Sequence, residues 1–208
     1  KTICITDPKE IEGIIRKCPY CTVGLTDLNG NPYVIPMNFA YDASKGEHGT
    51  IFLHSGPEGS KLDMVQQHPT VCISFCEGHE LVYMHQQVAC SYSMKSRSVM
   101  CRGQVRFIDD MDEKRRVLDL FMEHYTQNKC GYSDPAVRNV KIWEIPVEEF
   151  AASRLDPTER SAITGAFACT HPAYDLPRHR RVSVRLWRGI CMAFVGHLYG
   201  SRETLARL

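Results

Sequence analysis

The 208-residue chain lacks long apolar runs, internal repeats and low-complexity segments. No window contains eighteen consecutive apolar residues, so no membrane-spanning helix is expected. The N-terminal residues also lack the apolar stretch of a secretory signal peptide. With 43% apolar and 24% charged residues, the composition is that of a globular protein and excludes a collagen-like or coiled-coil chain. The length suits one domain of about 150 residues with an extension, or two small domains.

Lysine is missing from the C-terminal part of the chain. Residues 1–151 contain 16 Lys and Arg against 20 Asp and Glu, whereas residues 152–208 contain nine Arg, no Lys and four acidic residues. This change in composition predicts a domain of residues 1–151 followed by an Arg-rich C-terminal extension of residues 152–208.

The extension mixes Arg with aromatic residues around residues 178–188, a pattern also found in segments that contact nucleic acid or acidic lipid. We favour an extension that folds against the rest of the chain or onto a partner, and we expect neither a nucleic acid nor a membrane as a partner. A segment of different coding origin is the third interpretation.

Cysteine is plentiful, with ten residues, and several lie in apolar strand-like runs such as Val71–Phe75. We expect these to pack as small apolar side chains in a protein of the reducing cytoplasm. Cys18 and Cys21 enclose Pro-Tyr, as in a glutaredoxin active site. However, a helix-like segment precedes the pair and no βαβ unit surrounds it, so we do not expect redox function.

Cys72, Cys76 and His79, with His85 and Cys90 downstream, are candidate metal ligands. The two cysteines share one face of a predicted strand, where residues four positions apart lie about 13 Å from each other, which is long for chelation of one ion. We therefore expect no metal, with a structural zinc or iron–sulfur site as the alternative.

The hydrophobic pattern predicts a mainly β protein. A helix is expected to begin at Thr6–Glu10, and further helices are expected at residues 61–67 and 111–125. Strands and helices do not alternate, which favours a small antiparallel barrel with helical decorations over a Rossmann sheet. Pro36 predicts a bulge or a sheet edge, and Gly103 predicts a bulge. The expected strands cover residues 21–26, 33–41, 50–55, 71–76, 98–109 and 140–150.

Residues 54–63 are the most informative stretch for chemistry. A strand ends in His54 and Ser55, a Gly-containing turn follows, and a helix opens at Ser60 and Lys61. Backbone N–H groups at a helix start, together with a lysine, favour binding of an anion such as phosphate. The plainer interpretation is a strand–turn–helix connection in which Ser60 caps the helix.

Three motifs stand out in the chain: Tyr33–Tyr41 (YVIPMNFAY), Ile51–Asp63 (IFLHSGPEGSKLD) and Ala89–Phe107 (ACSYSMKSRSVMCRGQVRF). They resemble motifs of the flavin-binding split-barrel family related to pyridoxamine 5′-phosphate oxidase. Within that family, the chain is most similar to the branch of nitroimidazole resistance proteins, or 5-nitroimidazole reductases. With the closing strand at residues 142–147, the resemblance covers about residues 2–151.

The resemblance implies a six-stranded antiparallel split barrel and a homodimer that binds FMN, or alternatively FAD, between its subunits. By this resemblance, one group of residues lines the isoalloxazine ring: Pro36, Met37 and Asn38. A second group lies at the flavin edge and phosphate: His54, Ser55, Lys61, Arg97 and Ser98. His54 is also the candidate for local proton chemistry, because no other histidine lies inside a motif on which the resemblance rests.

The function implied by this resemblance is flavin-dependent reduction of a nitro-aromatic or other small electron acceptor. The cofactor would carry electrons taken from a reduced nicotinamide or another reductant, while the protein orients it and supplies a proton. The alternative is a non-enzymatic flavin or haem binding module on the same barrel. A pyridoxamine 5′-phosphate oxidase itself is less favoured, because the Arg-rich substrate motif and the C-terminal motif of that subfamily do not occur at matching positions.

Overall fold

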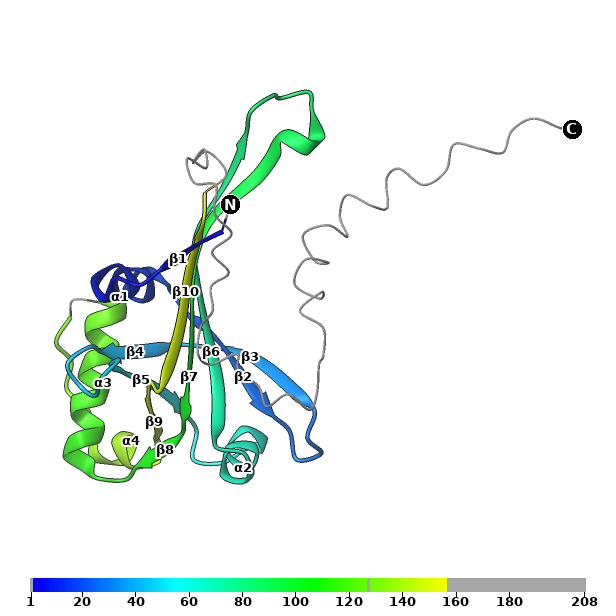
Figure 1. Ribbon diagram of the computed structural model, residues 1–208. Helices are drawn as coiled ribbons and strands as arrows, with labels where there is room; N and C mark the ends of the chain where they lie inside the picture. Colours follow the sequence, from blue (N-terminus) through cyan, green and yellow to red (C-terminus); the bar gives the residue numbers. More distant parts are fainter. Residues whose placement is uncertain (1, 127, 157–208) are drawn as a thin grey trace, which may run out of the picture. The chain divides into compact units, whose positions relative to one another are not determined.

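The computed structural model describes residues 2–126 and 128–156 (Figure 1). Apart from its first five residues, the predicted C-terminal extension lies outside the described residues. The helices and strands are β1 (Thr2–Ile5), α1 (Pro8–Lys17), β2 (Cys21–Thr26), β3 (Pro32–Met37), β4 (Phe39–Asp42), β5 (Thr50–Ser55), α2 (Ser60–Gln67), β6 (Thr70–Tyr83), the 3₁₀ helix η1 (Ala89–Ser91), β7 (Tyr92–Gln104), β8 (Arg106–Ile108), α3 (Met111–Tyr125), α4 (Asp134–Asn139), β9 (Lys141–Pro146) and β10 (Glu149–Leu155).

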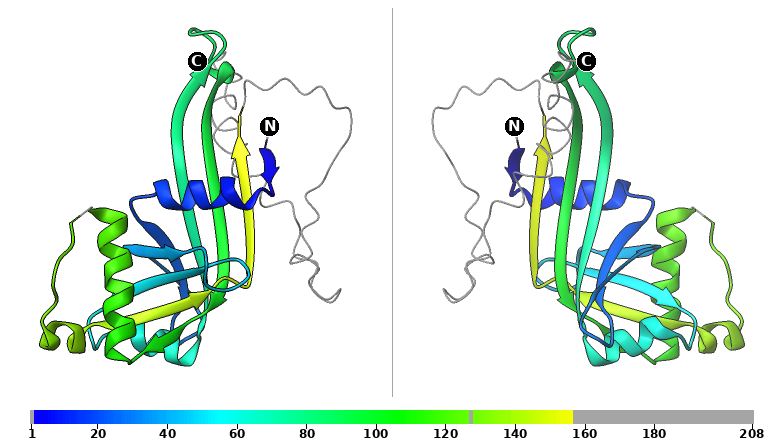
Figure 2. Two further views of the ribbon diagram at one scale, coloured as in Figure 1. Left: turned by 90° about the vertical axis from the view of Figure 1, so that its left-hand side faces the viewer. Right: turned by 90° about the vertical axis from the view of Figure 1, so that its right-hand side faces the viewer.

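The strands form two antiparallel sheets. The larger sheet has the order β1-β10-β7-β6-β2-β3, and the smaller has the order β4-β5-β9-β8. Strands of the small sheet run across those of the large sheet, as Figure 2 shows. The chain passes from one sheet to the other at Asn38, between β3 and β4. This mainly β arrangement confirms the predicted split-barrel fold.

Strand β5 is buried on both of its faces, which explains its unbroken apolar sequence. Ile51 and Leu53 belong to the main core, together with Trp143 of β9. Phe52 points to the other side, where it packs with Val117 and Phe121 of α3 in a second cluster. The successive side chains of a strand alternate between its faces, so one short strand joins the interior to the helix that covers the small sheet.

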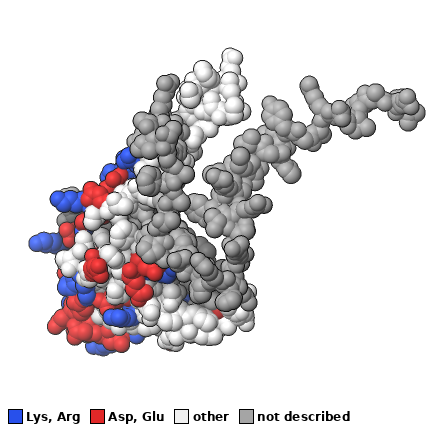
Figure 3. Space-filling model, in the orientation of Figure 1, with Lys and Arg blue, Asp and Glu red and all other residues white. Residues whose placement is uncertain are grey.

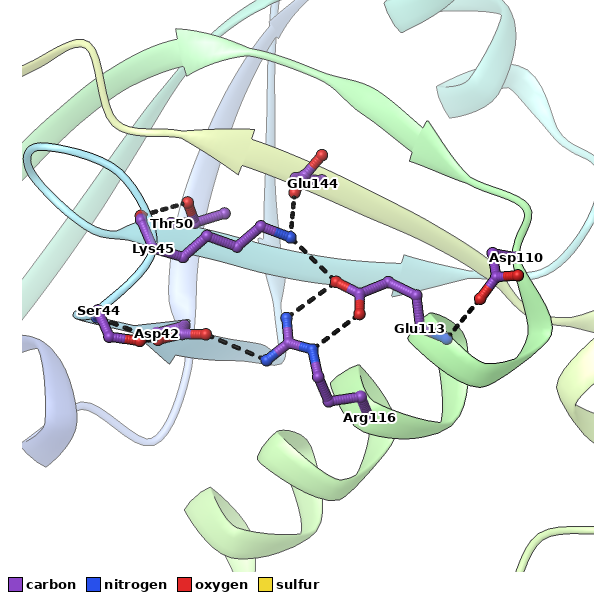
Figure 4. Close-up of polar contacts among 8 residues, drawn as sticks. All are labelled: Asp42, Ser44, Lys45, Thr50, Asp110, Glu113, Arg116 and Glu144. Carbon is purple, nitrogen blue, oxygen red and sulfur yellow. Dashed lines mark hydrogen bonds and ion pairs between the residues drawn. The ribbon is translucent and has the colours of Figure 1, made fainter.

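Ion pairs fasten α3 to the small sheet, and Figure 4 shows their geometry. Glu113 accepts from Arg116 at 2.8 Å and from Lys45 at 2.9 Å, and Lys45 also pairs with Glu144 of β9 at 2.7 Å. Arg116 reaches Asp42 at the end of β4 at 3.1 Å. The arginine and the lysine lower the pKa of Glu113 to about 2 through direct hydrogen bonds.

Charged side chains of both signs gather over α3 and the neighbouring surface (Figure 3). Because these charges alternate in sign and pair with one another, the face of α3 is a structural surface rather than a site for an anionic or cationic partner. No helix among the described residues is long and apolar enough to span a membrane.

The described residues divide into two compact units, one of residues 2–82 and 94–156 and the other of residues 83–93. Within the second unit, the rings of Tyr83 and Tyr92 lie 4.8 Å apart. Ser91 Oγ donates to His85 O at 2.6 Å, and Tyr92 Oη donates to Gln86 O at 2.8 Å. Local hydrogen bonds therefore hold this turn.

Four of the predicted strands are divided or extended. The strand expected at residues 71–76 is extended, because β6 runs from Thr70 to Tyr83. Residues 33–41 form β3 and β4, residues 98–109 lie mostly in β7 and β8, and residues 140–150 contain β9 and the start of β10. Strand β10 continues to Leu155, four residues beyond the predicted end of the domain, and pairs with both β1 and β7. The predicted edge position of Pro36 is confirmed, because β3 is the last strand of the large sheet.

Candidate functional site

The motif of residues 54–63 folds as a strand, a turn and a helix. Strand β5 ends at Ser55, and α2 begins at Ser60 with Gly59 as its N-cap. Gly59 has φ of 132°, which side chains other than glycine rarely allow. No side chain caps the helix, so the expectation that Ser60 is the cap is wrong. Without a side-chain acceptor, the first N–H groups of α2 are suited to an anion.

Lys61 occupies the second position of α2 and is half-buried. Within the described part of the chain, no salt bridge or hydrogen bond occupies its ammonium group, although nine other Lys and Arg side chains form salt bridges there. A lysine at a helix start repels the positive end of the helix dipole, and this arrangement becomes favourable when an anion binds between them. The start of α2 and the Lys61 ammonium therefore support one anion site.

His54 lies beside this helix start, at the end of β5. Its ring packs edge-on against Phe121 of α3, with centroids 4.8 Å apart. The pKa of His54 is lower than its ordinary value of 6.5, mainly because protein atoms displace water from the ring, and also because the Lys61 ammonium repels the imidazolium. The imidazole is therefore mostly neutral at pH 7, and a bound anion would raise its pKa.

Ser55 has a hydroxyl group that is already engaged on both sides. Its Oγ accepts from Trp143 Nε1 at 3.1 Å and donates to Gly56 O at 3.0 Å. A phosphate oxygen needs a donor, so Ser55 would have to release the Gly56 carbonyl in order to bind one. The Trp143 bond fixes the oxygen near the end of β5 in either case.

The Pro36–Asn38 segment ends next to His54. Phe39 pairs with Leu53 across the antiparallel strands β4 and β5. The residue before Phe39 therefore lies opposite the residue after Leu53, which places Asn38 level with His54. Pro36 and Asn38 are exposed and Met37 is buried. Pro36 has no N–H to leave unpaired at this open sheet edge, which allows a flat ring to lie beside the strand.

Arg97 and Ser98 lie elsewhere in the same chain. Arg97 pairs with Glu77 of β6 at 3.1 Å, and Ser98 Oγ lies 3.2 Å from Ser153 Oγ. Strand β6 starts after α2 at Thr70, so Glu77 stands about 23 Å further along the strand at about 3.3 Å per residue. One chain therefore brings together His54, Ser55, Lys61 and Asn38 but not Arg97.

A pocket of about 380 Å³ surrounds Arg97. Both signs of charge line it, and its lysine and two arginines each have a carboxylate partner: Lys95 with Asp156, Arg97 with Glu77, and Arg154 with Glu10. An anion that binds Arg97 must compete with the Glu77 carboxylate.

Helix α3 contributes residues that the sequence did not reveal as part of the site. Phe121 contacts His54, and Tyr125 accepts a hydrogen bond from Phe39 N at 3.0 Å. The sequence predicts Phe121 only as part of a helix over residues 111–125. Phe121 and Tyr125 are four residues apart, so the sequence could have predicted that they share one face of the helix. Nothing in the sequence indicates which strand that face contacts.

The cysteine motif shows no sign of redox chemistry. Cys18 is the C-cap of α1, and its thiol donates to Ile14 O at 3.4 Å. Burial raises the pKa of Cys18 to about 11 and that of Cys21 to about 12. Thiols with such pKa values are not nucleophiles at neutral pH. Residues 2–126 and 128–156 contain no group of three or more possible metal ligands.

The family assignment follows from comparison with known proteins. Residues 7–162 match the family model described as pyridoxamine 5′-phosphate oxidase. The chain belongs to this family. A crystal structure of a protein from Bacteroides thetaiotaomicron VPI-5482, named for 5-nitroimidazole antibiotic resistance, is 55% identical, with a TM-score of 0.66 over 74% of this chain and 87% of that one.

More distant structures share the fold of this family member. The flavocytochrome Anf3 from Azotobacter vinelandii is 19% identical, with a TM-score of 0.60 over 86% of this chain and 87% of that one. The FAD and heme binding protein from Mycobacterium smegmatis is 13% identical, with a TM-score of 0.61 over 84% of this chain and 94% of that one. No curated protein sequence matches the chain.

Proposed function

We propose that this protein is a flavin-dependent oxidoreductase that reduces a nitro-aromatic or other small electron acceptor. The observation that carries the proposal is the start of α2, where Lys61 stands beside His54 and no side chain of the described residues caps the helix or pairs with the Lys61 ammonium. The family match and the 55% identity to a protein named for nitroimidazole antibiotic resistance support the choice of acceptor.

The residues at the α2 start fit the phosphate of a flavin nucleotide. The N–H groups that follow Gly59 and the ammonium of Lys61 would bind its oxygens. Pro36, Met37 and Asn38 would line the ring, because Asn38 is level with His54 and the edge of β3 is open. FMN and FAD both present a phosphate for this site, and FMN is our preference.

A bound flavin would carry electrons from a reduced nicotinamide to the acceptor. The task left to the protein is orientation and proton supply, because nitro groups take up protons as they are reduced. His54 is suited to hold such a proton, since the phosphate would offset the repulsion from Lys61 and raise the pKa of the imidazole. Water can replace it, so the expected loss in His54→Gln is about tenfold to hundredfold, at the low end for general acid catalysis.

Turnover under anaerobic conditions tests this activity. The bound flavin is reduced with a reduced nicotinamide, and a 5-nitroimidazole is then mixed in while flavin absorbance is followed. We expect reoxidation to accelerate with acceptor concentration, and to slow in His54→Gln at unchanged flavin content. Flavin that binds but is not reoxidised faster by the nitroimidazole or other small acceptors would instead favour a non-enzymatic binding module.

We also propose that the working form is a homodimer in which two chains share each flavin. Support comes from the position of Arg97 within one chain: it pairs with Glu77, which lies about 23 Å along β6 from Thr70, where that strand starts after α2. If both residues contact one phosphate, they belong to different copies. Light scattering should then give a dimer, whereas a monomer of 23.7 kDa with bound flavin would contradict shared sites.

Mixing two inactive variants tests shared sites more sharply. A mixed dimer of Lys61→Glu and Arg97→Ala chains has one site with both changes and one site with neither, if the two residues come from different chains. In an equal mixture about half of the dimers are mixed, so flavin binding should return to about a quarter of all sites. If both residues act within one chain, mixing restores nothing.

A further inference from the structure

We propose that Tyr125 is a positioning residue for the flavin site, acting on Asn38 through the backbone of Phe39; this rests on the proposed function. The chain leaves the edge of the large sheet at Met37 and joins the edge of the small sheet at Phe39. Only Asn38 lies between the two strands. Tyr125 provides the acceptor for the Phe39 N–H, at 3.0 Å.

The hydroxyl group of Tyr125 fills a gap in the sheet hydrogen bonds. Strand β4 has β5 on one side, and no strand of residues 2–126 and 128–156 lies on the other. A backbone N–H that faces such an edge without water or another acceptor is destabilising. The bond from Phe39 to Tyr125 satisfies this group and ties the first residue of β4 to α3.

Helix α3 holds Tyr125 in a fixed place. The neighbouring His124 packs against the Tyr125 ring and against the Phe39 ring, with centroids 4.6 Å apart in both cases. His124 Nε2 lies 3.1 Å from Cys18 O, and because a carbonyl only accepts, Nε2 donates. At the other end of α3, the ion pairs of Glu113 anchor the helix to the small sheet.

One face of α3 therefore contacts the ends of both strands, β4 and β5, that border the proposed flavin ring. Phe121 and Tyr125 are four residues apart and so lie on the same side of the helix. Phe121 packs on His54 at the end of β5, while Tyr125 holds the amide next to Asn38. Burial raises the pKa of Tyr125, so its hydroxyl group stays protonated at neutral pH.

Tyr125→Phe removes the hydroxyl group and keeps the ring that packs on His124. Tyr20→Phe is the matched control, because Tyr20 is 55% exposed and its hydroxyl makes no hydrogen bond within the described part of the chain. We expect Tyr125→Phe to weaken flavin binding about five- to tenfold, in line with a lost hydrogen bond, and to alter the visible spectrum of the bound flavin. The control should match the wild type in both.

Amide exchange followed by NMR separates this proposal from the proposed function. In Tyr125→Phe, the Phe39 amide should lose protection by about tenfold while the Leu53 amide keeps it, whether or not flavin binds. If the wild type binds flavin and Tyr125→Phe binds it with the same affinity and spectrum, the positioning role is refuted. Unchanged exchange at Phe39 refutes it as well. A wild type that binds no flavin contradicts the proposed function instead, and faster exchange at Phe39 would still show that Tyr125 fixes this segment.

Discussion

Glu113 lies at the centre of the ion pairs that attach α3, and replacing it with Gln should destabilise the protein in a pH-dependent way. Its pKa changes from an ordinary value of 4.5 to about 2 in the folded protein. At about 1.36 kcal/mol per pH unit, this change corresponds to at most about 3 kcal/mol of unfolding free energy. Lys45 and Arg116 are 38% and 41% exposed, so screening by water reduces our expectation to about 1–2 kcal/mol at pH 7.

The pH dependence gives the sharper test. The pKa of Glu113 is lower in the folded state than in the unfolded state, so its ionised carboxylate stabilises the folded protein at a pH above 4.5. This stabilisation is lost as the pH falls from 4.5 towards 2 and the carboxylate takes up a proton. Urea unfolding gives the free energy of unfolding of the wild type and of Glu113→Gln at pH 7 and at pH 3. The difference in this free energy between the two proteins should be at most half as large at pH 3 as at pH 7. Glu123→Gln, on the exposed side of the same helix, should leave the free energy of unfolding unchanged at both pH values. A Glu113→Gln difference that is equal at both pH values would refute the reasoning.

Three further changes have direct readouts. Lys61→Gln should raise the pKa of His54, measured by NMR without flavin, because it removes a repelling charge; an unchanged pKa would show that the two side chains do not interact. A chain without residues 157–208 should remain folded and bind flavin, because β10, which lies between β1 and β7 in the large sheet, ends at Leu155; insoluble protein would show that the domain boundary is wrong. Cys18→Ser should leave flavin content unchanged, since a hydroxyl can replace the buried thiol as a donor; loss of flavin would contradict our assignment of a structural role.

Local sequence patterns identified several elements of the fold. The helix start at Asp7, strand β5 and helix α3 were predicted where the structure has them, because capping residues and strong periodicity determine them. The chain reversals were missed: residues 140–150 were predicted as one strand but form β9 and the first part of β10, which lie in different sheets.

Gly103 illustrates why such breaks are hard to foresee. A bulge was predicted there, and the structure shows a close approach that also requires glycine, since a Cβ would collide with Pro146 O and lie 2.9 Å from Ile145 Cγ2. This is a contact between segments more than forty residues apart. The sequence alone offers no signal for it.

The candidate site was predicted in part. The strand–turn–helix motif indicated an anion site from residues adjacent in sequence, and the structure adds an uncapped helix start and the proximity of Lys61 to His54. The roles of Phe121 and Tyr125 depend on how α3 packs on the small sheet. Such packing arises between distant segments, so periodicity could indicate burial but not the partner.

The central claim is that the start of α2 binds the phosphate of a flavin, and a flavin titration of matched charge reversals tests it most directly. Lys61 and Lys9 both occupy the second position of a helix, but α1 is capped by Asp7 and α2 has no side-chain cap. A charge-assisted hydrogen bond contributes about 1.5–3 kcal/mol, and about 1.4 kcal/mol is a tenfold change in affinity.

The freshly purified wild type should show a flavin spectrum, and the dissociation constant for flavin should rise at least tenfold in Lys61→Glu and remain unchanged in Lys9→Glu. Circular dichroism should be the same for all three proteins, because a glutamate in the first turn suits the helix dipole. Lys61→Glu protein that binds flavin with wild-type affinity, or a wild type that binds none, would contradict the claim.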